Sequence, residues 1–119
     1  MSRFLEQLRE RVLFFDGGMG TQVQARDLTA EDFGGKRWDG CIDYLSLTRP
    51  DVVESIHAAY FDAGADIVET NSFQASRTRL EEWDLGARTV ELNRAAAAAA
   101  RRVADRYAAA DGRLRFVAG

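Results

Sequence analysis

Residues 12–22 read VLFFDGGMGTQ, an apolar run followed by an aspartate and then by three glycines within four positions. A continuous apolar run of this length is typical of a strand buried on both faces of a parallel sheet, although periodicity alone does not exclude a helix. Parallel α/β folds bind their ligands at the carboxyl ends of strands. A carboxylate beside bare backbone is costly there unless it binds something. We therefore predict a strand at 12–15 and a binding loop after it.

The rest of the chain alternates between helix and strand signals. Apolar spacing, capping residues and glycine stops predict three helices that alternate with three strands. The first helix is capped by Ser2, the second has Thr48 as its cap and Pro50 in its first turn and stops at Gly64, and the third lies at 89–109. The strands follow these helices in turn, at 12–15, 65–70 and 114–118. Strands that alternate with helices through short links indicate a parallel α/β architecture.

Composition limits the classes of function. The chain has 119 residues, enough for one domain, and a formal charge of −3 that offers no concentrated basic surface for nucleic acid or an anionic membrane. It has no run of 18 apolar residues, so we expect neither a signal peptide nor a membrane span. The single cysteine, Cys41, cannot form an internal disulfide or a cysteine-rich zinc cluster, which favours a reducing, cytoplasmic compartment.

Two acidic residues follow two of the predicted strands. Asp16 ends the first strand and Glu69 ends the second. If these strands are parallel neighbours, roughly 5 Å apart, both carboxylates share one rim. Two carboxylates suit an ammonium group, and the N–H groups of Gly17 and Gly18 beside them suit a carboxylate. Together they describe a free amino acid. The candidate binding residues are Asp16, Gly17, Gly18, Glu69 and Asn71, and no catalytic residue or metal ligand is assigned.

The glycine loop has two other interpretations. A dinucleotide fingerprint is incomplete, because Val23 stands where the third glycine would be, and no Gly-Lys-Ser/Thr element is present. The structural alternative is that the glycines form a tight turn in which Asp16 caps the next helix, with Glu69 and Asn71 capping the following turn. Composition alone leaves that alternative open.

Five stretches occur in the order expected of one known family: VLFFDGGMGTQVQ from residue 12, EDFGG at 31–35, GCIDYLSLTRPDVVESIHAAYFDAGADIVETNSF at 40–73, ELNRAAAAAAR from 91 and RFVAG at the end. Together they resemble the homocysteine S-methyltransferase domain of cobalamin-dependent methionine synthases, which is a (β/α)₈ barrel. Such a barrel typically needs about 250 residues. The resemblance therefore implies that residues 1–119 are an N-terminal fragment holding the first three β/α units of an incomplete barrel.

The resemblance also implies roles for the candidate residues. In this family the acidic residue after strand one, here Asp16, helps to hold the amino group of homocysteine, and the backbone at Gly17 and Gly18 lies against the amino-acid end of the substrate. Glu69 and Asn71 would line the same mouth. The reaction is methyl transfer to the sulfur, which zinc binds and deprotonates.

The family's zinc is held by cysteines near late barrel strands, and these ligands are absent here. Cys41 is expected to be a small buried residue rather than a substitute ligand, and His57 to be packed or exposed rather than catalytic. Cobalamin and the methyl donors, methylcobalamin and methyltetrahydrofolate, would belong to other domains of a longer parent.

The three predicted strands leave open edges, so we expect partly uncovered apolar residues at 12–15, 67–68 and 116–117 and a tendency to self-associate. We expect this chain alone to be inactive. The alternative function is a noncatalytic α/β module that binds an amino acid or a partner chain through its open edge.

Overall fold

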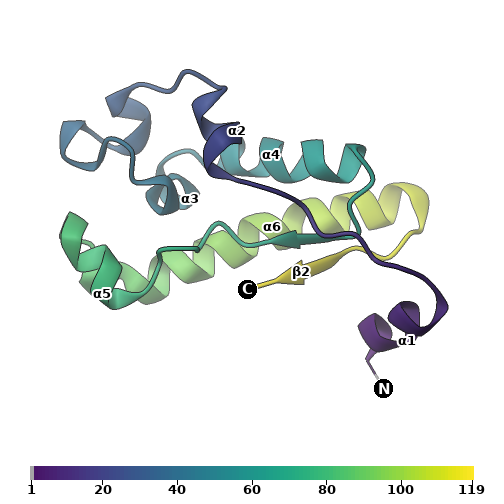
Figure 1. Ribbon diagram of the computed structural model, residues 1–119. Helices are drawn as coiled ribbons and strands as arrows, with labels where there is room; N and C mark the ends of the chain where they lie inside the picture. Colours follow the sequence, from purple (N-terminus) through teal and green to yellow (C-terminus); the bar gives the residue numbers. More distant parts are fainter. Residues whose placement is uncertain (1) are drawn as a thin grey trace.

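The computed structural model describes residues 2–119 and shows helices packed on a short parallel sheet (Figure 1). Its regular elements are α1 (Arg3–Glu10), α2 (Gly20–Gln24), α3 (Leu45–Thr48), α4 (Pro50–Asp62), β1 (Ile67–Glu69), α5 (Arg77–Leu80), α6 (Thr89–Asp111) and β2 (Phe116–Ala118). Short 3₁₀ turns lie at Ala30–Phe33, Lys36–Trp38, Ile42–Tyr44, Glu81–Trp83 and Gly86–Arg88. None of the helices within residues 2–119 is long and apolar enough to cross a membrane.

The sheet is parallel, as the alternation of elements predicts. β1 pairs with β2 in the register Ile67 to Phe116, Val68 to Val117 and Glu69 to Ala118. The predicted strand at 12–15 is reduced to an isolated parallel bridge between Phe15 and Ile67. The spatial order is therefore the 12–15 segment, β1 and β2, but the first of these is not a regular strand.

Two aspartate side chains close the ladder between the 12–15 segment and β1. In its middle, the N–H of Ile67 donates to the carbonyl of Phe14 at 3.1 Å and the N–H of Asp16 donates to the carbonyl of Ile67 at 2.9 Å. At one end the N–H of Phe14 donates to Asp66 Oδ2 at 3.0 Å, and at the other the N–H of Glu69 donates to Asp16 Oδ2 at 3.1 Å. Carboxylates thus accept the bonds at both ends, where a longer ladder would use backbone carbonyls.

Asp66 also joins the amino ends of all three extended segments. Its side chain is only 1% exposed and accepts two hydrogen bonds from the Arg11 guanidinium, at 2.8 and 3.2 Å, and one from Arg113 at 3.3 Å. These charges, with the N–H of Phe14, lower the pKa of Asp66, the bond from Arg11 contributing most. A buried carboxylate with this many charged and backbone donors holds the segments in one register.

The burial of the strands agrees with expectation at 12–15 and departs from it in β1. Val12, Phe14 and Phe15 are 70%, 63% and 54% exposed, as predicted for a strand with missing neighbours, because β1 pairs with only one edge of the 12–15 segment. Ile67 and Val68, by contrast, are buried, whereas partial exposure was predicted. Val68 is covered by a cluster that α4 and α6 build, namely Phe61, Ala100, Val103 and Ala104.

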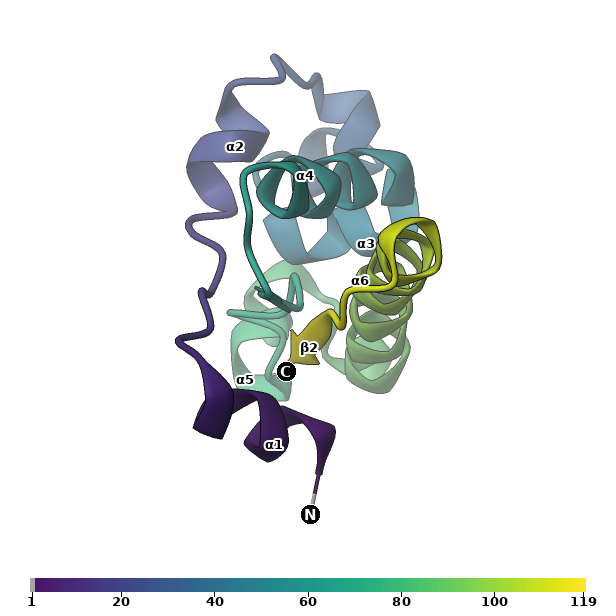
Figure 2. The same ribbon diagram turned by 90° about the vertical axis from the view of Figure 1, so that its right-hand side faces the viewer.

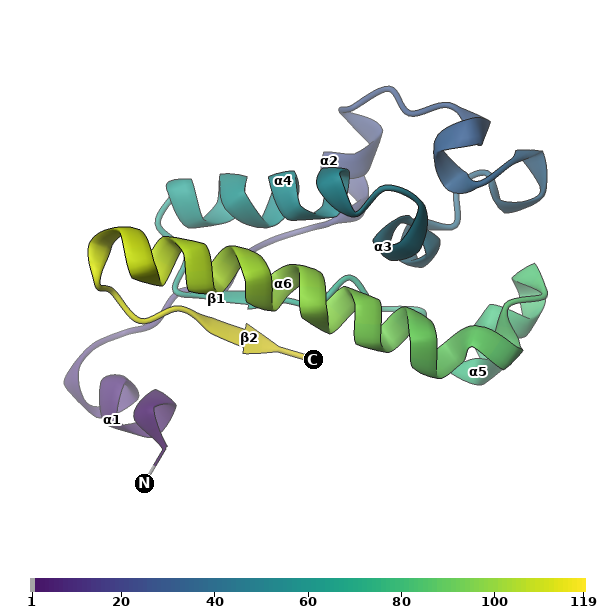
Figure 3. The ribbon, with the colours of Figure 1, turned by 180° about the vertical axis from the view of Figure 1, so that it is seen from behind.

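The two long helices cover one face of the sheet side by side (Figures 2 and 3). α6 approaches closely because its buried face is made largely of alanine, at positions 96, 99, 100 and 104. α4 begins at Pro50, as predicted, and the chain leaves it through Gly64 in the left-handed region at φ +106°. Thr48 is not its cap: residues 45–48 form the separate helix α3, and Arg49 takes the cap position without a side-chain bond.

Candidate functional site

A cavity of about 600 Å³ opens at the carboxyl ends of β1 and the 12–15 segment. All five residues that the sequence singled out, Asp16, Gly17, Gly18, Glu69 and Asn71, line it. They come from two loops that are far apart in sequence. The parallel ladder brings these loops together, as the position of both loops after strands predicts.

One carboxylate oxygen of Asp16 accepts a hydrogen bond, and the other accepts none within residues 2–119. Its Oδ2 accepts the N–H of Glu69, whereas its Oδ1 is buried and has no hydrogen-bond partner among residues 2–119. Burial raises the pKa of Asp16, and the neighbouring Glu69 carboxylate adds to the rise. A buried, unpaired carboxylate oxygen is costly, and an ammonium group in the cavity would relieve that cost.

The glycine loop offers backbone donors beside this carboxylate. Within the described part of the chain, the N–H groups of Gly17 and Gly18 donate no hydrogen bond. Gly17 also lies against the ring of Tyr60, and a Cβ at this position would sit 3.1 Å from the tyrosine hydroxyl. Glycine here therefore permits a close approach between the loop and α4, and leaves bare backbone facing the cavity.

Asn71 lines the cavity, but its amide nitrogen is already used. Its Nδ2 donates to the carbonyl of Ile42 at 2.9 Å and to Ser46 Oγ at 3.1 Å, and the side chain is buried. These bonds tie the loop after β1 to the turn that leads into α3. Glu69, in contrast, has an exposed side chain. Of the two residues, Glu69 is the freer to meet a ligand.

Asp43 is a third carboxyl of the cavity and was not among the candidate residues predicted from the sequence. Asp43 is buried, its Oδ1 accepts the N–H of Gln74 at 3.1 Å, and burial raises its pKa. The available signal was its place in the GCIDYLSLTRP stretch, but no strand end pointed to it. The residues that line the cavity include three carboxyls and no lysine, arginine or histidine, with an apolar wall formed by Met19, Ile42, Phe73 and Trp83.

The side chains of this chain do not fit a zinc site. Residues 2–119 contain no group of three or more histidine, cysteine or acidic side chains placed to hold a metal ion. Cys41 lines the cavity but is buried, and burial raises the pKa of its thiol, which opposes formation of the thiolate that a metal needs. His57 is packed inside α4, away from the cavity, and burial lowers its pKa to about 4.

The parallel strand ends, the glycine loop and the acidic cavity together define an α/β protein with a site for a small cationic ligand. The profile of the homocysteine S-methyltransferase family matches residues 13–119, and the chain belongs to this family.

Individual relatives agree with this assignment. The chain is 49% identical to the methionine synthase of Mycobacterium tuberculosis and 45% identical to that of Mycobacterium leprae, in each case over 115 residues. These matches cover 97% of this chain but only 9% of either relative. Two structures of the homocysteine methyltransferase MmuM from Escherichia coli, an oxidized and a metallated form, superpose with a TM-score of 0.75 at 26% identity. They cover 94% and 98% of this chain, and 38% and 39% of MmuM.

Proposed function

We propose that this chain supplies the amino-acid-binding strand ends of a homocysteine S-methyltransferase of the methionine synthase type. Such an enzyme transfers a methyl group to the homocysteine sulfur and so makes methionine. In this proposal residues 1–119 are the N-terminal part of a homocysteine-binding (β/α)₈ barrel and hold its first three β/α units. Family membership and the likeness to MmuM support the proposal.

The observation that carries the proposal is the buried, unpartnered Oδ1 of Asp16 at the cavity. An amino acid would place its ammonium group between Asp16 and Glu69 and its carboxylate on the free N–H groups of the glycine loop. Its thiol-bearing arm would lie along the apolar wall. A cavity without a lysine, arginine or histidine selects for the ammonium and leaves the carboxylate to backbone donors.

Zinc, when bound in this family, makes the homocysteine thiol a better nucleophile. Because residues 2–119 do not provide a donor set for it, we assign zinc, cobalamin and the methyl donors to parts of a longer protein. What this chain contributes is binding and orientation of the amino-acid end of the substrate. A cytoplasmic location, where thiols such as that of the free Cys41 stay reduced, is part of the same proposal.

The test is a titration of the chain with L-homocysteine, followed amide by amide in NMR spectra under reducing conditions. We expect shifts confined to the loops that line the cavity, and smaller shifts with propanethiol, which lacks both charged groups. A methyl-transfer assay on the same sample should show no methionine. If the spectra do not change at millimolar homocysteine, or change equally with propanethiol, the amino-acid site is wrong. Binding at the outer edge of the 12–15 segment would favour the noncatalytic module.

A further inference from the structure

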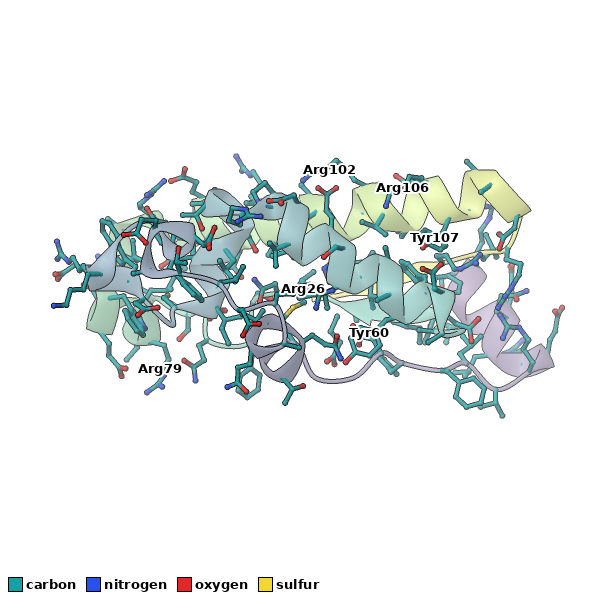
Figure 4. All side chains as sticks on the ribbon, turned by 90° about the horizontal axis from the view of Figure 1, so that it is seen from above. Arg26, Tyr60, Arg79, Arg102, Arg106 and Tyr107 are labelled. Atoms are coloured by element: carbon teal, nitrogen blue, oxygen red, sulfur yellow. The ribbon has the colours of Figure 1, made fainter. Side chains whose placement is uncertain are left out.

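Tyr60 contacts the glycine loop from outside the cavity. It belongs to α4 and does not line the cavity, yet its hydroxyl donates to the carbonyl of Gly18 at 2.7 Å. Its ring lies so close to Gly17 that an added Cβ would approach a ring carbon at 3.3 Å. Figure 4 shows Tyr60 on the side of α4 that faces the N-terminal segment, whereas Tyr107, a residue of α6, lies on the opposite side of α4.

The core fixes the position of this hydroxyl. Tyr60 lies one and two helical turns after Ile56 and Val53, two fully buried residues of α4, so all three share a face. The tyrosine ring packs against both the cluster that contains these residues and the cluster that covers β1. Because the ring is held on two sides, its hydroxyl has little freedom, and the bond to Gly18 transmits the position of α4 to the loop.

That bond also sets the direction of the next amide. A trans peptide is planar and points its C=O and N–H in opposite directions. Since the carbonyl of Gly18 points to Tyr60, the N–H of Met19 points away from α4, on the side of the loop where Met19 lines the cavity. Within residues 2–119 this N–H has no acceptor. It is therefore a third backbone donor, beside those of Gly17 and Gly18.

We propose that Tyr60 is a positioning residue, which orients the Gly18–Met19 peptide so that the N–H of Met19 receives the carboxylate of the amino-acid substrate. This inference rests on the proposed function and adds a specificity element to it. The carboxylate is recognised by backbone whose orientation is set from behind by one tyrosine hydroxyl, and not by a cationic side chain.

The experiment compares Tyr60→Phe with Tyr107→Phe. Each variant loses one hydroxyl and keeps its ring. The Tyr107 hydroxyl donates to the carbonyl of Ala58 and to the Asp62 carboxylate, so it joins α6 to α4 without touching the glycine loop. Each variant and the unchanged protein are titrated with L-homocysteine and with its decarboxylated analogue, aminopropanethiol. Thermal melts of the same samples report folding.

We expect Tyr60→Phe to raise the Kd of L-homocysteine about 5- to 10-fold, the loss that corresponds to one ordinary hydrogen bond. Its Kd for aminopropanethiol should stay within about twofold of the unchanged protein, because that ligand has no carboxylate. Tyr107→Phe should change neither Kd. In the spectra of Tyr60→Phe the amide of Met19 should shift even without ligand.

Three results would overturn the inference: equal loss of both ligands in Tyr60→Phe, no loss of either, or the same loss in Tyr107→Phe. The first and third would mean that Tyr60 acts only through general stability. Failure of the proposed function looks different, because then the unchanged protein itself does not bind L-homocysteine. If Tyr60→Phe does not fold, Tyr60→His, a smaller ring whose N–H donors do not reach as far as the tyrosine hydroxyl, must show the same selective loss.

Discussion

Asp16→Asn is the most direct test of the acidic site. Asparagine keeps the size of the side chain and an oxygen that can accept the N–H of Glu69, but it removes the charge that faces the cavity. A charge-assisted hydrogen bond to an ammonium group contributes roughly 1.5 to 3 kcal/mol. The Kd for L-homocysteine should therefore rise about 10- to 150-fold at neutral pH.

The stability of the unliganded protein should change in the other direction. Burial raises the pKa of Asp16 above its ordinary value of 3.8, so the folded state prefers the protonated carboxyl. The stability contribution of Asp16 is then greatest below that ordinary value and is lost as the pH rises through the raised pKa. Asparagine carries no such penalty. At neutral pH Asp16→Asn should melt at the same temperature as the unchanged protein or higher, while it binds more weakly.

The assay is a pair of measurements on each variant, a calorimetric titration with L-homocysteine and a thermal melt. Asp105→Asn is the matched control, because Asp105 is exposed on α6 and, among residues 2–119, its carboxylate pairs only with Arg101. It should leave the Kd unchanged. An unaltered Kd in Asp16→Asn would remove Asp16 from the site. A melting temperature that falls together with affinity would show that Asp16 acts by holding the ladder, not by binding the ligand.

Three further predictions concern stability and assembly. His57 is buried, neither ring nitrogen has a partner within residues 2–119, and burial lowers its pKa from 6.5 to about 4. Stability present above pH 6.5 should therefore be lost as the pH falls toward 4, by roughly 3 kcal/mol. In urea titrations His57→Leu should abolish this loss, and a loss of the same size in His57→Leu would assign it to another group. Asp66→Asn removes the charge that pairs with Arg11 and Arg113. Because both guanidiniums are exposed and would be solvated, the cost should be about 1.5 to 3 kcal/mol of unfolding free energy, that of charged hydrogen bonds. A variant as stable as the unchanged protein would contradict the role of Asp66 in joining the strands. The exposed side chains of Phe14 and Phe15 should promote self-association of the chain. Phe14→Ser should therefore lower the molar mass that light scattering measures at high protein concentration. An unchanged mass would show that the contact between copies lies elsewhere.

The long elements of the fold were predictable, because their signals are repeated. α4 and α6 each carry an apolar face through several turns, and α6 ends only two residues beyond its predicted end at 109. The short helices α2, α3 and α5, of four or five residues each, were not predicted, since one turn contains too few positions to show a period. α3 also explains the error at Thr48. Thr48 stands shortly before Pro50, where a cap residue would stand, but in the structure it is the last residue of α3.

The 12–15 segment shows the limit of the apolar-run rule. Its four apolar residues are typical of a strand buried on both faces, yet burial depends on which elements lie beside a segment. The exposure of this segment was predicted only from the missing neighbours of an incomplete barrel, not from the apolar run itself. The place of the acidic residues was easier to predict, because parallel strands deliver their end residues to one rim whatever covers them. That rule predicted that Asp16 and Glu69 lie together, and both line the cavity; their role in binding substrate stays a prediction. The rule did not point to Asp43, which also lines the cavity but does not follow a strand.

The closure of the ladder by Asp66 and Asp16 has a consequence for the order of events during synthesis. The partners of these bonds are 52 and 53 residues apart, which corresponds to about 3 to 10 s of translation at roughly 5 to 20 residues per second. During that interval the 12–15 segment has no β1 to pair with, and α1, with eight residues, is too short to persist alone. Residues 12–15 therefore leave the ribosome well before the strand on which they dock. The candidate amino-acid site cannot be complete in a nascent chain until Asn71 has emerged.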